Sequence, residues 1–239
     1  MEKYPLEPKN KPVLITKDML VSEDKIKKDT KNVDLEDNIT YLPPLSIILV
    51  ILNVLVFAWE LQTGALTSKE SIIEAGALYR PNVLDGEYWR LVSVMFLHGG
   101  FMHIIGNMVM LYLMGMLFER FFSPTKALLI YLLSGIMGAL LSMAISEGPG
   151  VGASGAIFGL MGANIYYLFK HRYLMTSISK RVGTVLVCVA IYSIAQGFLT
   201  PFVDNFAHIG GFLGGILFAI LMRGKQIAKK QNGPHTYPF

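Results

Sequence analysis

Ser154 and His208 are polar residues of catalytic type, and each lies at the start of an apolar segment. Polar side chains are costly in hydrocarbon, so those found in apolar segments usually serve a function. A histidine can remove the proton of a serine hydroxyl and so turn its oxygen into a nucleophile. Together the two residues predict a serine protease that works inside a membrane.

Acyl transfer also requires hydrogen-bond donors for the negative oxygen that develops on the attacked carbonyl. His103 and Asn107 are four residues apart, so a helix places both side chains on one face. A helix that begins near Ser154 adds free backbone N–H groups and a favourable dipole. These groups are candidates for an oxyanion hole, although a hydrogen bond between helices would explain Asn107 alone equally well.

Small residues could bring the serine and histidine helices into contact. They recur every four positions in both segments, a spacing that lets the backbones of membrane helices touch. Ordinary helix packing explains either series alone, whereas Ser154 and His208 together favour catalysis. The small residues are Gly155, Gly159 and Ala163 in the first segment, and Gly210, Gly211, Gly214 and Gly215 in the second.

The composition indicates a membrane protein. Of the 239 residues, 53% are hydrophobic and only 16% are charged, whereas soluble domains are about 25% charged. A helix crosses the hydrocarbon core of a bilayer with about 20 mainly apolar residues. Six stretches meet this need, so the expected fold is an all-α bundle of six transmembrane helices at about 45–62, 103–122, 127–145, 153–169, 182–199 and 205–222.

The bundle is expected to occupy residues 43–223 as one domain. A polar tail at 1–42 precedes it, and its first 40 residues carry 8 lysines and 9 acidic residues. Such a mixture favours disorder or a small cytoplasmic appendage. A short basic cytoplasmic tail is expected at 224–239.

Lysine and arginine gather in alternate connections, and cytoplasmic loops are the ones that carry such an excess. In the connections after the third and fifth stretches, the only charged residues are the acidic Glu147 and Asp204. Both termini are therefore expected in the cytoplasm, with His103, Ser154 and His208 at one depth below the external surface. The basic residues behind this orientation are Arg120, Lys126, Lys170, Arg172, Lys180, Arg181, Arg223, Lys225, Lys229 and Lys230.

Other functional classes fit the residue types less well. The net charge of +4 comes without a nucleic-acid motif or a basic stripe, so no nucleic-acid partner is expected. A zinc protease would need a His-Glu-x-x-His helix, which the sequence lacks. An aspartyl protease would need paired carboxylates, and Glu60 and Glu119 are expected near opposite membrane faces. No metal or cofactor is expected.

A transporter is an alternative from another functional class. Its polar groups would lie near the midplane of the membrane, whereas the polar residues here are expected at one end of the bundle. A transporter is therefore the weaker alternative.

Five elements of the sequence occur in order and at consistent depth. They are Trp89-Arg90, His98-x4-His103-x3-Asn107, Glu119-Arg120, Gly152-x-Ser154-Gly155 and Ala207-His208-x-x-Gly211-x-x-x-Gly215. Over about residues 45–222 they resemble the rhomboid intramembrane serine proteases, in the basic six-helix form found in bacteria.

The resemblance implies roles for these residues. Ser154 would be the nucleophile and His208 the general base and acid of a dyad. His103, Asn107 and the Ser154 N–H would form the oxyanion hole. Structural or supporting roles would fall to Trp89, Arg90, His98, Glu119, Gly152, Gly155, Gly211 and Gly215.

Phe158 lies one helical turn after Ser154, where many members of that family have tyrosine. Its ring could pack against His208 or simply belong to the core. Asp204, four residues before His208, is expected to be a loop residue near the membrane surface, because the family works without a third catalytic member.

The resemblance also implies a cellular setting and a substrate class. We expect a multi-pass protein of the bacterial plasma membrane, in contact with lipid, that cleaves transmembrane segments of single-pass proteins with helix-destabilising residues. An inactive relative that binds such clients without cutting them is the second alternative, but such proteins lack the serine or the histidine.

Overall fold

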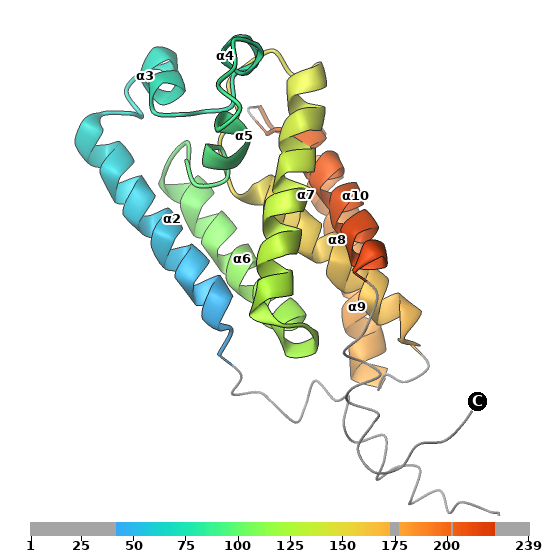
Figure 1. Ribbon diagram of the computed structural model, residues 1–239. Helices are drawn as coiled ribbons and strands as arrows, with labels where there is room; N and C mark the ends of the chain where they lie inside the picture. The colour runs from blue at the N-terminus through green and yellow to red at the C-terminus, as the bar shows by residue number, and fades with distance from the viewer. Residues whose placement is uncertain (1–41, 173–176, 202, 223–239) are drawn as a thin grey trace, which may run out of the picture.

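The computed structural model describes residues 42–172, 177–201 and 203–222. Within these ranges the chain is helical, with one isolated antiparallel bridge between Leu78 and Gly150. Six long helices form a bundle, and three short ones lie at one end of it, at the top of Figure 1. The helices are α2 (Pro44–Thr63), α3 (Lys69–Glu74), α4 (Arg80–Leu84), α5 (Arg90–Ser93), α6 (Phe101–Phe121), α7 (Pro124–Ile145), α8 (Ser154–Lys170), α9 (Ser177–Leu199) and α10 (Asn205–Leu221).

The six long helices coincide with the six predicted stretches, and their ends differ by a few residues. Among the described helices, α2, α6, α7 and α9 are long and apolar enough to cross a membrane. α8 and α10 have 17 residues each, fewer than the about 20 that a span usually needs. The all-α class is therefore confirmed, while the count of six spans stays a prediction. The predicted tails at 1–42 and 224–239 lie outside the described residues, except for Leu42.

Short polar side chains mark where several helices begin. Ser68 precedes α3 and accepts a hydrogen bond from the N–H of Ser71, and Ser123 does the same for Lys126 at the start of α7. Asp204 precedes α10 and accepts from the N–H of Ala207. Each supplies a partner for an N–H that the helix itself cannot satisfy.

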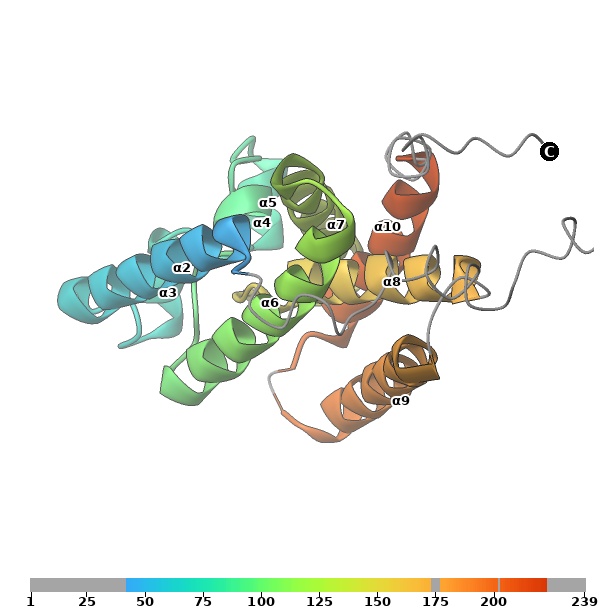
Figure 2. The ribbon, with the colours of Figure 1, turned by 90° about the horizontal axis from the view of Figure 1, so that it is seen from below.

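α8 is the central helix of the bundle, since it packs against α6, α7, α9 and α10. The view from below shows these helices arranged around it (Figure 2). Thirteen of its 17 residues are buried. The outer helices instead present apolar side chains outward, such as Leu55 on α2 and Ile191 on α9, which are 61% and 65% exposed. This pattern is typical of a protein surrounded by lipid, because side chains that face hydrocarbon are apolar.

The long connection between α2 and α6 is more ordered than the sequence suggested. No helix was predicted between the stretches at 45–62 and 103–122, and the structure places α3, α4 and α5 there. Helices this short are not stable alone and depend on tertiary contacts. Those contacts come from a buried arginine described below.

Candidate active site

Ser154 and His208 lie within hydrogen-bond distance of each other. Ser154 is the first residue of α8, and His208 lies in the first turn of α10. The Oγ of Ser154 is 3.0 Å from the Nε2 of His208. This is the contact that a serine nucleophile needs with its general base.

The His208 ring is oriented by an aromatic neighbour. Phe158 lies one turn below Ser154, and its ring stacks on His208 with centroids 4.3 Å apart and planes 11° from parallel. The buried Nδ1 of His208 has no hydrogen-bond partner in the described part of the chain. The arrangement is therefore a serine–histidine pair in which Phe158 covers one face of the imidazole, and no described carboxylate bonds Nδ1 as it would in a triad.

Asp204 has partners other than the His208 ring. Its Oδ1 accepts from the N–H of Ala207 at 3.0 Å and from the hydroxyl of Ser146 at 3.5 Å, and its Oδ2 accepts from the hydroxyl of Ser142. Ser142 belongs to the last turn of α7, and Ser146 is the residue that follows the helix. Asp204 thus joins the beginning of α10 to the end of α7.

Glycines let α8 and α10 meet backbone to backbone. A Cβ built on Gly211 would overlap the carbonyl oxygen of Gly155, and one built on Gly215 would overlap that of Gly159. Any side chain at these positions of α10 would force the helices apart. The contact therefore brings the first turns of the two helices close enough for the serine–histidine hydrogen bond.

His103 and Asn107 lie on α6 beside Gly152. A Cβ built on Gly152 would be 2.8 Å from the Nε2 of His103 and 3.5 Å from the Nδ2 of Asn107. Gly152 also has a φ of +129°, a conformation that side chains rarely allow. The segment just before Ser154 therefore passes directly in front of both side chains, which only glycine permits.

Both side chains can donate hydrogen bonds on that side. The buried Nδ2 of Asn107 has no partner among the described residues. The Nδ1 of His103 accepts from the N–H of Gly99 at 3.3 Å, so in a neutral ring Nε2 carries the proton. Both donors thus lie beside Gly152, two residues before Ser154, and α8 begins at Ser154 with N–H groups that the helix itself does not use.

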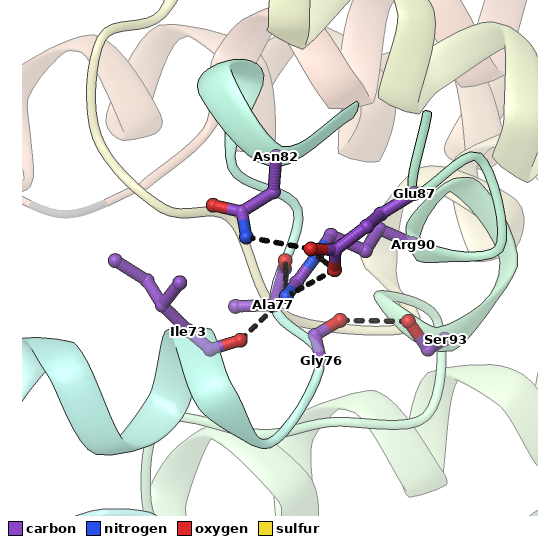
Figure 3. Close-up of polar contacts among 7 residues, drawn as sticks. All are labelled: Ile73, Gly76, Ala77, Asn82, Glu87, Arg90 and Ser93. Atoms are coloured by element: carbon purple, nitrogen blue, oxygen red, sulfur yellow. Dashed lines mark hydrogen bonds and ion pairs between the residues drawn. The ribbon is translucent and has the colours of Figure 1, made fainter. Parts of the chain in front are cut away.

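Arg90 ties together the short helices above the site. It is 4% exposed and donates from Nη1 to the carbonyls of Ile73 and Ala77. Its Nε is 2.7 Å and its Nη2 2.6 Å from Oε2 of Glu87 (Figure 3). Hydrogen bonds from Asn82 and from Arg90 lower the pKa of the Glu87 carboxyl. One guanidinium thus joins the end of α3, the α3–α4 turn and the beginning of α5.

This arrangement extends to the segment that leads into Ser154. Leu78, next to the Ala77 carbonyl that Arg90 binds, forms a two-way backbone bridge with Gly150 at 2.9 and 2.8 Å. The N–H of Gly152 then donates to the carbonyl of Val94. Half-exposed Trp89 packs beside Gly76 and the Arg90 guanidinium.

Glu119 lies at the opposite end of the bundle from the serine. Its carboxylate accepts from the backbone N–H groups of Leu45 and Ser46 and from the Ser46 hydroxyl. It therefore satisfies the N–H groups at the start of α2, where a negative charge is favoured. Glu119 joins the end of α6 to the beginning of α2.

Glu60 was expected near a membrane face and without a role in the site. The structure buries it completely within the bundle, and both carboxylate oxygens accept from the backbone N–H of His98 at 3.1 Å. His98 is also fully buried, and burial, followed by the charge of nearby His103, lowers its pKa to about 4. A lone acidic residue within an apolar stretch was the available signal for Glu60.

A small cavity lies beside Ser154, between the segment 150–152, α7 and the start of α10. Its volume of about 20 Å³ accommodates about one water molecule. Asp204 and Met95 contribute to its wall. The described residues contain no cluster of side chains suited to hold a metal ion.

The family model of the rhomboid domain matches residues 85–225, more than half of the chain. The chain belongs to the rhomboid family. It is 34% identical to "Rhomboid protease GluP" of Bacillus subtilis (strain 168) over 74% of its own length and 34% of that relative. It is 41% identical to "RHOMBOID-like protein 5" of Arabidopsis thaliana (62% of the chain, 49% of the relative) and to "RHOMBOID-like protein 2" of the same plant (65% and 50%).

The rhomboid match contains all the helices that carry Ser154, His208, His103 and Asn107. The family match and the apolar helices together show that the chain is a multi-pass membrane protein. The chain spans between a third and a half of the length of these rhomboid relatives. α2, with Glu60, lies before the part that the rhomboid model matches.

Proposed function

We propose that this rhomboid chain is an intramembrane serine endopeptidase with Ser154 and His208 as its catalytic dyad. The observation that carries the proposal is the 3.0 Å contact between Ser154 Oγ and His208 Nε2, beside two donors on α6. The relatives' names, which include a rhomboid protease, support the same activity. The partly apolar, enclosed surroundings strengthen electrostatic interactions with developing charge.

In the first half of the reaction, neutral His208 takes the hydroxyl proton through Nε2 as Ser154 Oγ attacks the substrate carbonyl carbon. The carbonyl oxygen becomes an oxyanion, which accepts hydrogen bonds from His103 Nε2, Asn107 Nδ2 and the Ser154 N–H. His208 then gives its proton to the leaving amine as the peptide bond breaks, and an acyl-enzyme remains.

In the second half, His208 removes a proton from a water molecule as the water oxygen attacks the acyl carbon. The same donors hold the second oxyanion, and the proton returns to Ser154 Oγ as the new carboxyl product leaves. Phe158 keeps the imidazole in one plane throughout. His208 accepts and returns every proton in these steps, so the dyad requires no third titratable residue.

We propose that the substrates are transmembrane segments of single-pass proteins. A membrane helix hides its carbonyls in hydrogen bonds, so a segment must unwind before Ser154 can attack. Glycine or proline in the segment lowers that cost by about 1 or 3 kcal/mol relative to alanine. With six spans and cytoplasmic termini, Ser154 lies on the external side, so the cut falls in the external half of the client.

The test is active-site labelling and cleavage in liposomes. Wild-type protein should react with a fluorophosphonate and cleave a fluorogenic transmembrane peptide that contains glycine or proline. Ser154→Ala should lose both reactions, and His208→Ala should lose nearly as much, with the double variant little worse. Equal labelling of wild type and Ser154→Ala would refute the assignment, and a cut mapped to the cytoplasmic half would refute the orientation.

A further inference from the structure

We propose that Glu60 of α2 is a positioning residue for the oxyanion hole. This inference rests on the proposed function, and it concerns a side chain that does not touch the reacting atoms. Glu60 is fully buried and is the one charged residue of α2. An acidic group in that setting requires a compensating partner. Among the described residues, that partner is the backbone N–H of His98, which both carboxylate oxygens accept.

The contact fixes the segment that leads into α6. Phe57, one turn before Glu60, packs edge to face on Phe101 at 5.2 Å, the first residue of α6. The two contacts from α2 therefore bracket Gly99 and Gly100. Gly100 has a φ of +145° and precedes the helix without a side-chain cap, so this segment depends on α2 for its position.

The segment in turn fixes His103. The N–H of Gly99, the residue after the one that Glu60 holds, donates to the Nδ1 of His103 at 3.3 Å. The buried His98 ring also packs against the His103 ring at 5.3 Å. The first contact leaves the proton on Nε2, and the second limits rotation of a side chain that is otherwise exposed.

The chain of contacts ends at the reacting atoms. The Nε2 edge of His103 faces Gly152, two residues before Ser154. Glu60 thus acts through His98 and Gly99 on the donor that meets the oxyanion. Loss of the carboxylate leaves the buried N–H of His98 without an acceptor, and the segment must move to find one. Movement of about 1 Å at such a donor is enough to lower turnover about a hundredfold.

The experiment compares two substitutions of similar size at Glu60. Glu60→Gln keeps an oxygen that can accept from His98, and Glu60→Met does not. The matched control is Asn53→Leu, which removes an equally buried polar group of α2 whose amide donates to the carbonyl of Leu49 in its own helix. The readouts are kcat and KM for a fluorogenic transmembrane peptide in liposomes, with the melting temperature of each variant.

We expect Glu60→Met to lower kcat about ten- to a hundredfold with KM unchanged, and Glu60→Gln to stay within about threefold of wild type. Asn53→Leu should lower the melting temperature without lowering kcat. In a His103→Ala background, Glu60→Met should reduce the remaining kcat by less than about twofold, because its effect passes through His103. A purely structural role predicts the same proportional loss in both backgrounds.

If Glu60→Met does not fold, Gly99→Pro and Gly99→Ala test the next contact. Proline removes the N–H that meets His103, whereas an alanine Cβ would lie 3.7 Å from Nδ1, an ordinary distance. Proline should therefore lower kcat about tenfold relative to alanine. Equal rates for that pair, or a Glu60→Gln enzyme as slow as Glu60→Met, would overturn the inference. Inactive wild-type protein would instead refute the proposed function.

Discussion

Gly211→Ala should abolish the proposed activity by separating the two helices that carry Ser154 and His208. The added Cβ would overlap the Gly155 carbonyl oxygen and lie 2.7 Å from the carbonyl carbon, whereas ordinary contacts begin at 3.4 Å. The neighbour is backbone, so α8 and α10 must move apart by about 1 Å. Overpacking of this kind costs about 1–3 kcal/mol of stability. It would also lengthen the 3.0 Å contact between Ser154 and His208, for which we expect about a hundredfold loss of kcat.

The matched control for this prediction is Gly106→Ala on α6, because a Cβ there meets nothing within 4 Å. Both variants replace a helical glycine by alanine, and the control should gain up to about 1 kcal/mol of stability from helix propensity. The assay is fluorophosphonate labelling rate and peptide turnover, each normalised to folded protein. If Gly211→Ala reacts as fast as Gly106→Ala, close backbone contact does not set the spacing of the dyad, and this reasoning fails.

Three further predictions follow from the site. Asn107→Ala and His103→Ala should each lower turnover about a hundred- to a thousandfold, and full rates in both would return these residues to helix packing. Asp204→Ala should cost about 1 kcal/mol in chemical denaturation because it removes the cap of α10, whereas Asp204→Asn, which can still cap, should lose much less; equal losses would contradict the cap. Because burial lowers the pKa of His98 to about 4, the unfolded state binds more protons between pH 4 and its ordinary value of about 6.5. The free energy of unfolding should therefore be highest above pH 6.5 and should fall by up to about 1.4 kcal/mol per pH unit between pH 6.5 and pH 4. Chemical denaturation of wild type and His98→Asn across this range checks the prediction, and equal slopes of the unfolding free energy with pH would contradict it.

The helices of the bundle were predictable because a long apolar stretch in a membrane must satisfy its backbone hydrogen bonds internally, and a helix does so. The short helices α3, α4 and α5 were not predicted, since their order depends on Arg90 reaching carbonyls of Ile73 and Ala77 that lie well before it in the sequence. Only Ser68, a residue type common before helices, gave a local signal for α3.

The proximity of Ser154 and His208 could be predicted because glycine spacing, residue type and depth all indicated the same contact. The stacking of Phe158 was left open, since a phenylalanine at that position also suits a core. Glu60 could not be assigned, because its partner is a backbone N–H in a connection whose path no sequence pattern specifies. Side-chain types are visible in a sequence, but backbone donors are not.

The short, enclosed α8 has a consequence for how the protein responds to its lipid. At 17 residues it is about 26 Å long, shorter than the about 30 Å of an average hydrocarbon core. A lipid-facing helix of that length would thin the bilayer or tilt to suit it. α8 is surrounded by α6, α7, α9 and α10 instead, so changes in membrane thickness act on the lipid-facing helices and reach Ser154 through those neighbours. The depth of Ser154 therefore depends on the packing of the protein more than on the thickness of the bilayer around it.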